Sequence, residues 1–396
     1  MKKVLNIILI TIPVVIILVL LVFMLERNKK IDLPTPTGNY GIGRITYEWS
    51  DTARIDTLAS EPGTRRELFL WVWYPTTKNN TNSTSEYIPE EWRKAISERQ
   101  GRFARFFRKK LSKIHAFSVE GAKLPSEKKQ YPIVIMKSGI GASTTDYTSL
   151  AEDLASNGYI VIGSDSPYSS NVVVFSDGRI INDNAKGNPS NAGPSVDRNR
   201  RLDRLVTLWT DDIRFIMDKL EQINSSDSTN LFYQRLNLKE MGVLGHALGG
   251  ATAFRFCFDD PRCKAGVSIN GIPFGNVNQN KLSKPFMFLM ADQIDEPDSV
   301  KLKVKRNIDT IYIQLPETSV WINLKGAKHY NFNDQSLIRE HFIAKKAGDI
   351  GPIEKRRGLQ IAISSVRVFL DVNLKGLPFT KIKELQNKYP ELEFVQ

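Results

Sequence analysis

One glycine-rich segment has residue types and spacing that could do chemistry. The motif GHALG at residues 245–249 follows an apolar run, residues 241–244, and precedes a helix-forming stretch. In a G-x-S-x-G nucleophile elbow, the glycines permit a strained strand-to-helix turn that lifts a serine hydroxyl above a sheet. Here the serine position holds Ala247. A methyl group can neither attack a carbonyl nor form an acyl-enzyme, so the sequence predicts the scaffold of an ester-hydrolysing site without its nucleophile.

A second glycine-rich turn supplies the rest of such a site. Gly139-Ile140-Gly141 follows the apolar run 133–136. We expect the backbone N–H groups of Ile140 and Leu248 to form an oxyanion hole, which needs donors and no particular side chain. Neither Ser143 nor Ser268 sits between glycines, so a relocated serine nucleophile is not favoured.

No metal or cofactor is expected. The four histidines, at positions 115, 246, 329 and 341, show no paired ligand spacing. The net charge of +12, from 55 Lys and Arg against 43 Asp and Glu, favours anionic partners. No nucleic-acid-binding motif accompanies this charge, so nucleic acid is not a predicted partner.

The elements that must position the site alternate along the chain. Short apolar or period-2 runs predict strands at residues 68–74, 133–136, 159–163, 241–244, 265–269, 285–290 and 319–324. Helical spacing of three and four appears at residues 147–154, 202–220 and 359–370. Strands alternating with helices predict an α/β fold with a mostly parallel central sheet and helices on both faces. Ligands then belong at the carboxyl ends of the strands.

The first 30 residues form a separate segment. Residues 4–25 carry no charge and are almost wholly aliphatic, and as a helix they would reach about 33 Å. We therefore expect an uncleaved single-pass membrane anchor at residues 1–30, followed by one domain at residues 31–396. Basic residues flank both ends of the span, so charge does not fix its orientation.

Several segments together resemble the platelet-activating factor acetylhydrolase family of α/β-hydrolases. They are TGNYGIG at residues 37–43, residues 65–75 and 150–162, the elbow, and GAKHYNF at residues 326–332. The resemblance covers about residues 38–370. It implies an α/β-hydrolase fold, a phospholipid or short acyl ester ligand, and hydrolysis of short sn-2 acyl esters without calcium.

Matched position by position, the family's catalytic triad falls on Ala247, Asn270 and His329. The nucleophilic serine and the acid are therefore both replaced. Loss of the serine alone costs about 10⁶ in turnover, and an amide in place of the acid favours the wrong histidine tautomer. Two further family histidines are replaced by Ser138 and Ser166. Asp292 or Asp295 remains an alternative acid, because many α/β-hydrolases carry the triad acid after the strand that corresponds to residues 285–290.

A basic amphipathic helix is expected at residues 93–117. Its predicted lipid-facing residues are Phe103, Arg105, Phe106, Phe107 and Lys109. In the resembling family the segment before the oxyanion strand contributes to docking on lipid particles, whereas the alternative is that the apolar stripe packs on the sheet. Cys257 and Cys263 could form a small disulfide loop or remain reduced. A disulfide would place the domain outside the cytoplasm, as the family's secretion implies.

Three hypotheses follow from the sequence. The first is a membrane-anchored, acetylhydrolase-like protein that is catalytically impaired or a pseudoenzyme and that is retained for binding lipid or acyl ligands. The second is an active carboxylester or lipid hydrolase that uses water positioned by His329 and the oxyanion loop. The third is a non-catalytic interaction protein. The sequence leaves the oligomeric state open.

Overall fold

A computed structural model describes residues 2–78, 84–99, 109–127, 129–192, 197–273, 282–292, 297–339 and 345–395 of the 396-residue chain. Its strands are β1 Ile31–Asp32, β2 Gly41–Ile55, β3 Arg65–Thr76, β4 Ile114–His115, β5 Val119–Glu120, β6 Tyr131–Lys137, β7 Ile160–Asp165, β8 Val172–Val174, β9 Ile180–Asn182, β10 Leu236–His246, β11 Ala265–Ile269, β12 Phe286–Ala291, β13 Val320–Leu324 and β14 Leu392–Val395. Its α-helices are α1 Lys2–Asn28, α2 Glu90–Arg99, α4 Thr148–Ser156, α5 Arg198–Ser226, α6 Leu248–Asp259, α7 Asp298–Tyr312, α8 Gln335–Ile338, α10 Lys355–Lys375 and α11 Thr380–Lys388. Short 3₁₀ turns are η1 Leu111–Lys113, η2 Thr144–Tyr147, η3 Pro189–Ala192 and η4 His329–Phe332.

One ten-stranded sheet organises the domain, in the order β14-β13-β12-β11-β10-β6-β7-β3-β2-β5. The six strands from β13 to β7 are parallel. Every residue of β6, β7, β11 and β12 is buried. Strands buried on both faces read as continuous apolar runs, which is why these runs were recognisable in the sequence.

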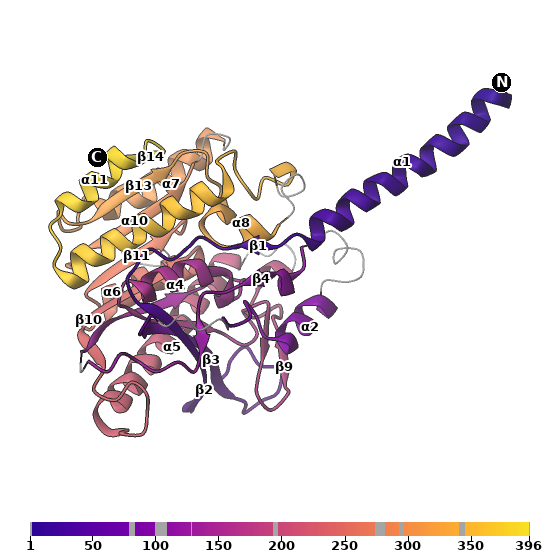
Figure 1. The fold of residues 1–396 in the computed structure, drawn as a ribbon. Helices are drawn as coiled ribbons and strands as arrows, with labels where there is room; N and C mark the ends of the chain where they lie inside the picture. Colours follow the sequence, from indigo (N-terminus) through magenta and orange to yellow (C-terminus); the bar gives the residue numbers. More distant parts are fainter. Residues whose placement is uncertain are drawn as a thin grey trace.

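Helices cover both faces of the sheet (Figure 1). On one face, α4, α10 and α11 pack with inward residues such as Val134, Leu244 and Val267. On the other, α5, α6 and α7 pack with the alternate residues, for example Ile135 and Val243. The alternation follows from the period-2 geometry of a strand, and it confirms the predicted α/β architecture with a mostly parallel sheet and two helical layers.

The strand at residues 68–74 was predicted and is β3, but the strands β2 and β14 and the antiparallel pairing at both edges were not predicted. β3 runs antiparallel to β7, β2 antiparallel to β3, and β14 antiparallel to β13. The strand β2 alternates intermediate and exposed residues over much of its length, so it lacks a continuous apolar run. Its outer neighbour β5 pairs with it at only Gly43 and Arg44.

The prediction of one basic helix over residues 93–117 was wrong. The helix α2 ends at Arg99, and Leu111–Lys113 and Ile114–His115 form the 3₁₀ turn η1 and the strand β4. At residues 109–117 the helical spacing of apolar residues therefore does not correspond to a helix. In this stretch β4 pairs with β1 instead. The predicted lipid-facing residues Phe103, Arg105, Phe106 and Phe107 lie outside the described residues.

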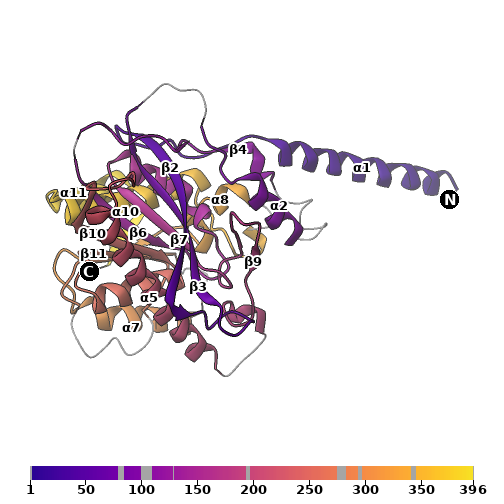
Figure 2. The same cartoon turned by 90° about the horizontal axis from the view of Figure 1, so that it is seen from below.

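The helix α1 extends away from the domain in both views (Figures 1 and 2). Its described apolar side chains are exposed, as Ile17 and Leu25 show. The side chains of residues 1–10, 19, 23 and 26 lie outside the described part. Within that part, no helix is both long and apolar enough to cross a membrane, so the predicted transmembrane span at residues 4–25 finds no support there.

Cys257 and Cys263 form a disulfide. Cys257 lies in α6 and Cys263 just before β11, and both are buried. The bond closes a short loop that links the helix after the elbow to the next strand. Because β11 ends directly before Asn270, the disulfide ties together two elements that carry the site.

Removing this bond should destabilise the domain. We expect the Cys257→Ala/Cys263→Ala double variant to lose about 2 kcal/mol of unfolding free energy, because the closed loop restricts the unfolded chain. Urea denaturation under non-reducing conditions measures the loss. The unmodified chain after reduction with dithiothreitol is the control and should show a similar loss, and a double variant as stable as the oxidised unmodified chain would contradict the expectation.

Candidate active site

The turn between β10 and α6 has the geometry of a nucleophile elbow. Ala247 stands at its apex with φ of +52° and ψ of −117°, in a region that L-residues rarely adopt. Its N–H donates to the carbonyl of Ile269 at 2.9 Å, and its carbonyl accepts from the N–H of Gly250 at 3.0 Å. The chain therefore keeps a strained backbone at a position that has no reactive side chain.

Close backbone approaches explain the flanking glycines. A Cβ atom on Gly245 would lie 2.0 Å from the carbonyl oxygen of Gly249, and one on Gly249 would lie 2.2 Å from the carbonyl oxygen of Lys137. No side chain fits at either position without a backbone shift. The glycines of the GHALG motif are thus required by packing, whether or not the site reacts.

Asn270 and His329 lie together as the resemblance implied. Asn270 directly follows β11, and His329 begins η4 after β13. The side-chain nitrogen Nδ2 of Asn270 lies 2.9 Å from Nδ1 of His329. The other end of the amide, Oδ1, accepts the backbone N–H of Ala291 at 3.2 Å. Both ends of the amide are therefore engaged.

This contact fixes which nitrogen of His329 carries the proton. The Ala291 N–H can only donate, so Asn270 presents its oxygen to Ala291 and its NH₂ to His329. Nδ1 of His329 must then be an acceptor, and the neutral ring carries its proton on Nε2. A triad histidine needs the reverse, because an acidic partner accepts from Nδ1–H and leaves the Nε2 lone pair free to take a proton.

Both imidazoles of the site favour the neutral form. Burial lowers the pKa of His329 below its usual value. His246 packs against it with ring centroids 4.3 Å apart, and burial followed by the proximity of His329 lowers the pKa of His246 further. Nδ1 of His246 lies 2.6 Å from the hydroxyl of Tyr147. The sequence did not predict this packing of the two imidazoles.

The oxyanion loop lies against the elbow. A Cβ placed on Gly139 would be 3.4 Å from both the methyl of Ala247 and the carbonyl oxygen of His246. Ile140 and Leu248, the predicted oxyanion donors, line the same cavity as Ala247. Leu248 opens α6, so its N–H is at the positive end of that helix.

A cavity of about 510 Å³ opens above Ala247, within the range of roughly 300–1,000 Å³ that is typical of small-molecule sites. Asn270 and His329 also line it, and it lies at the carboxyl ends of the parallel strands, where a ligand was expected. Its apolar lining consists of Ile88, Ile96, Leu111, Ile140, Leu202, Leu248, Ile272 and Ile338.

Lys109 contributes to this cavity. It was predicted to face lipid, and the structure instead places it among the lining residues with Arg99, Arg198 and Arg339. Arg99 is paired with Asp183, and Arg339 is paired with Asp349 at 2.6 Å and lies over the ring of Tyr330.

The alternative catalytic residues are engaged elsewhere. Asp292 accepts the backbone N–H of Gly326 at 2.8 Å, while Asn270 occupies Nδ1 of His329, and Asp295 lies outside the described residues. The hydroxyl of Ser268 donates to the carbonyl of Gly271. Ser143 lines the cavity, but it lies outside the elbow turn, and its backbone N–H donates to Asp146 at 3.1 Å. The geometry therefore gives no support to a rescue by Asp292 or to a relocated serine at either position.

A buried pair of Lys137 and Ser166 offers another serine that a lysine could activate as a nucleophile. Nζ of Lys137 lies 2.7 Å from the hydroxyl of Ser166, and burial lowers the pKa of Lys137 to about 8. Serine–lysine pairs do act in some hydrolases. Here both side chains are at most 1% exposed and neither lines the cavity, so substrate has no access to them.

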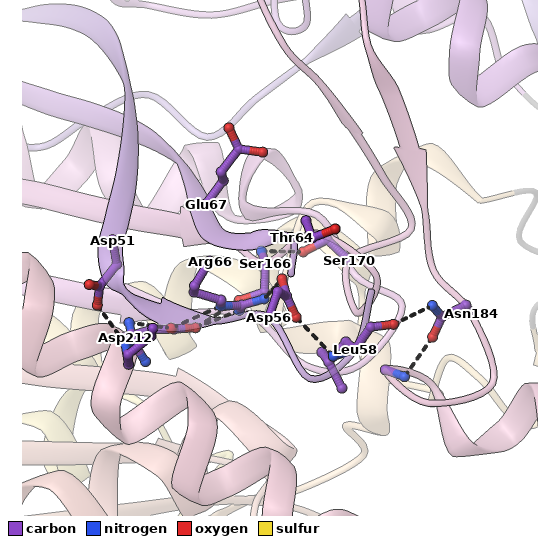
Figure 3. Close-up of polar contacts among 12 residues, drawn as sticks. Asp51, Asp56, Leu58, Thr64, Arg66, Glu67, Ser166, Ser170, Asn184 and Asp212 are labelled. Carbon is purple, nitrogen blue, oxygen red and sulfur yellow. Dashed lines mark hydrogen bonds and ion pairs between the residues drawn. The ribbon is translucent and has the colours of Figure 1, made fainter. Parts of the chain in front are cut away.

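Behind the oxyanion loop lies a buried ion cluster, which the sequence did not indicate (Figure 3). Arg66 is fully buried and pairs with Asp212 at 2.6 Å and with Asp56 at 2.8 Å. Arg54 also binds Asp212, at 3.0 Å. Ser166 lies 3.5 Å from Asp212 and so connects this cluster to Lys137, the last residue of β6.

Fold and site together define an α/β-hydrolase. A ferulic acid esterase from Streptomyces cinnamoneus shares the fold, with a TM-score of 0.75 and 23% identity over 93% of this chain and all of that chain. The parallel sheet, the elbow after β10 and the histidine after β13 occupy the places that this class requires.

The family follows from the sequence comparisons. The family model of platelet-activating factor acetylhydrolase, isoform II, matches residues 25–176 and 211–388, and the chain belongs to this family. Platelet-activating factor acetylhydrolase of Cavia porcellus is 24% identical over 78% of this chain and 72% of its own length. A probable 1-alkyl-2-acetylglycerophosphocholine esterase of Arthroderma benhamiae is also 24% identical, over 67% of this chain and 66% of its own length.

Breaking the buried ion cluster should destabilise the fold strongly. We expect Arg66→Met to cost about 3–5 kcal/mol of unfolding free energy, since it leaves the buried Asp56 without its cation and Asp212 with Arg54 alone. The matched control is Arg179→Met, which removes an exposed pair with Glu67 and should cost at most about 1 kcal/mol. Equal losses in urea denaturation of the two variants would show that the cluster does not stabilise the domain.

The same cluster predicts a pH dependence. Burial raises the pKa of Asp212, but Arg66 and Arg54 outweigh it and hold that pKa below its ordinary value. Its contribution to stability is therefore complete above the pKa of the unfolded chain, about 3.9, and is lost as the pH falls through the folded value. Asp212→Asn should flatten the acid limb of a stability-against-pH curve, and an unchanged acid limb would contradict this.

Proposed function

We propose that this chain is an acetylhydrolase-like protein that binds a phospholipid or acyl ligand and has lost acyl-enzyme catalysis. One observation carries the proposal: the apex of the elbow holds Ala247, while Asn270 sets His329 in the tautomer that cannot accept a proton. The retained cavity and oxyanion loop support a binding role. The names of the relatives point to phospholipid esters as the class of ligand.

Turnover through an activated water is the second candidate function. The cavity is lined by His329, and oxyanion donors alone can retain about 10³ to 10⁴ of rate enhancement. Yet activation of water needs a ring nitrogen that is free to accept a proton, whereas the NH₂ group of Asn270 donates a hydrogen bond to Nδ1 and the ring proton therefore stays on Nε2. The geometry therefore favours the binding role over this reaction.

A direct assay separates these two functions. Purified full-length chain should hydrolyse a short-chain p-nitrophenyl ester no faster than its His329→Ala variant, and a serine-directed fluorophosphonate should not label it. Hydrolysis clearly above the variant, or covalent labelling, would falsify the proposed loss of catalysis.

Restoring the two lost groups should restore activity. We expect Ala247→Ser/Asn270→Asp to raise kcat/KM at least about 100-fold over the unmodified chain, because the serine gains an elbow already shaped for it and the aspartate reverses the tautomer of His329. Neither single variant should reach this rate, since the three groups act as a unit. A double variant that folds but gains nothing would show that the cavity no longer holds an ester in reactive geometry.

The membrane anchor and the extracytoplasmic position of the domain remain proposals from the sequence. They rest on the uncharged residues 4–25 and on the exposed apolar side chains of α1. Full-length chain expressed in cells should stay in the membrane pellet after an alkaline carbonate wash. Leu18→Lys/Leu20→Lys should release it, and recovery of the unmodified chain in the wash would contradict an anchor.

A further inference from the structure

The floor of the cavity carries hydrogen-bond donors where an esterase needs an acceptor. With Nδ1 of His329 bound to Asn270, the ring has Nε2–H left for a ligand. The backbone N–H groups of Ile140 and Leu248 border the same cavity. Among the described residues, neither N–H has a backbone acceptor outside the regular elements. The three residues that carry these donors line the same cavity as Ala247, where the reacting carbonyl of an ester would be expected to lie.

The charge of the cavity wall favours an anion. Arg99, Lys109, Arg198 and Arg339 line it against one carboxylate, Asp146. Asp146 is already engaged, because its oxygens accept the backbone N–H of Ser143 at 3.1 Å and the side-chain amide of Gln335 at 2.7 Å. Arg99 and Arg339 are themselves paired with Asp183 and Asp349, so the charge balance of this wall rests on Lys109 and Arg198 against Asp146.

We propose that the cavity binds a free carboxylate attached to an apolar chain, in preference to the ester of the same acid. The inference rests on the proposed function, since ester turnover would require the opposite polarity at His329. The carboxylate lies above Ala247 and accepts from Nε2–H of His329 and from the N–H groups of Ile140 and Leu248. The hydrocarbon chain of the ligand lies in the apolar part of the cavity, next to residues such as Ile96 and Leu202.

The missing serine side chain makes room for this ligand. A carboxylate has two charged oxygens, whereas an ester offers one strong acceptor and no charge. Hydrogen bonds to a charged acceptor are about twice as strong as neutral ones. With a hydroxyl at position 247, one oxygen of the acid would meet the nucleophile, and with the methyl of Ala247 that space is available.

The first test compares one acid with its ester on the same protein. Isothermal titration of full-length chain in mild detergent, with dodecanoate below its critical micelle concentration and methyl dodecanoate below its solubility limit, should give a Kd at least about tenfold lower for the acid. Equal or tighter binding of the methyl ester would overturn the proposal. Dodecyl phosphate is the third probe, and its binding more than about tenfold tighter than dodecanoate would show that the wall cations, rather than the three donors, select the ligand.

The second test reverses the polarity of His329. In Asn270→Asp the carboxylate accepts from Nδ1–H, so the Nε2 lone pair faces the ligand and the affinity for dodecanoate should fall at least about tenfold. The affinity for the methyl ester should change by less than about threefold. Asn270→Ala is the control, because it removes the amide without imposing the opposite tautomer, and its loss should be smaller. An unchanged ratio of acid to ester affinity in a folded Asn270→Asp variant would overturn the assigned role of Nε2–H.

Failure of this inference can be told apart from failure of the proposed function. Chromatography of the titrated samples measures how much dodecanoate is released from the methyl ester, and this release reports on catalysis alone. A chain that leaves the ester intact yet shows no preference for the acid contradicts only the carboxylate proposal. A chain that hydrolyses the ester contradicts the proposed function.

Discussion

A single backbone hydrogen bond, from the N–H of Ala291 to the side-chain oxygen of Asn270, sets the polarity of the site. It belongs to the last residue of β12, so the sheet itself holds the amide in one orientation. The amide in turn sets the tautomer of His329, and the tautomer decides whether the cavity presents a base or a donor. The chemistry of the site thus follows from the pairing of neighbouring strands, which acts on His329 through two successive hydrogen bonds, from Ala291 to Asn270 and from Asn270 to His329.

The elbow shows that the backbone geometry of a catalytic turn can persist without the nucleophilic serine. Ala247 keeps a positive φ, and the glycines on either side are needed because their neighbours approach within about 2 Å of where a Cβ would be. The buried cluster of Arg66, Asp56 and Asp212 reaches Lys137 through Ser166 and so supports the strand that carries the oxyanion loop. These interactions stabilise the fold, and they preserve the geometry of the site as a consequence.

The sequence predicted the central fold well because the inner strands are buried on both faces and therefore read as apolar runs. It did not predict β2, whose residues alternate, or β14, a short edge strand. The positions of Ala247, Asn270 and His329 came from motifs, whereas the orientation of the Asn270 amide depends on Ala291, a contact across strands that no local pattern encodes. The same holds for the contacts of His246 with Tyr147 and of Arg66 with Asp212, which join residues 99 and 146 positions apart along the chain.

The strand β2 has a consequence for the behaviour of the chain at high concentration. It is fifteen residues long but meets β5 at only two positions, so among the described residues most of its outer backbone has no strand partner. An open edge of this length is a template for sheet-to-sheet aggregation. The side chain of Glu48 is exposed on this strand. A foreign strand that docked there would have to desolvate this carboxylate, and this cost disfavours the recruitment of other chains to the edge of the sheet.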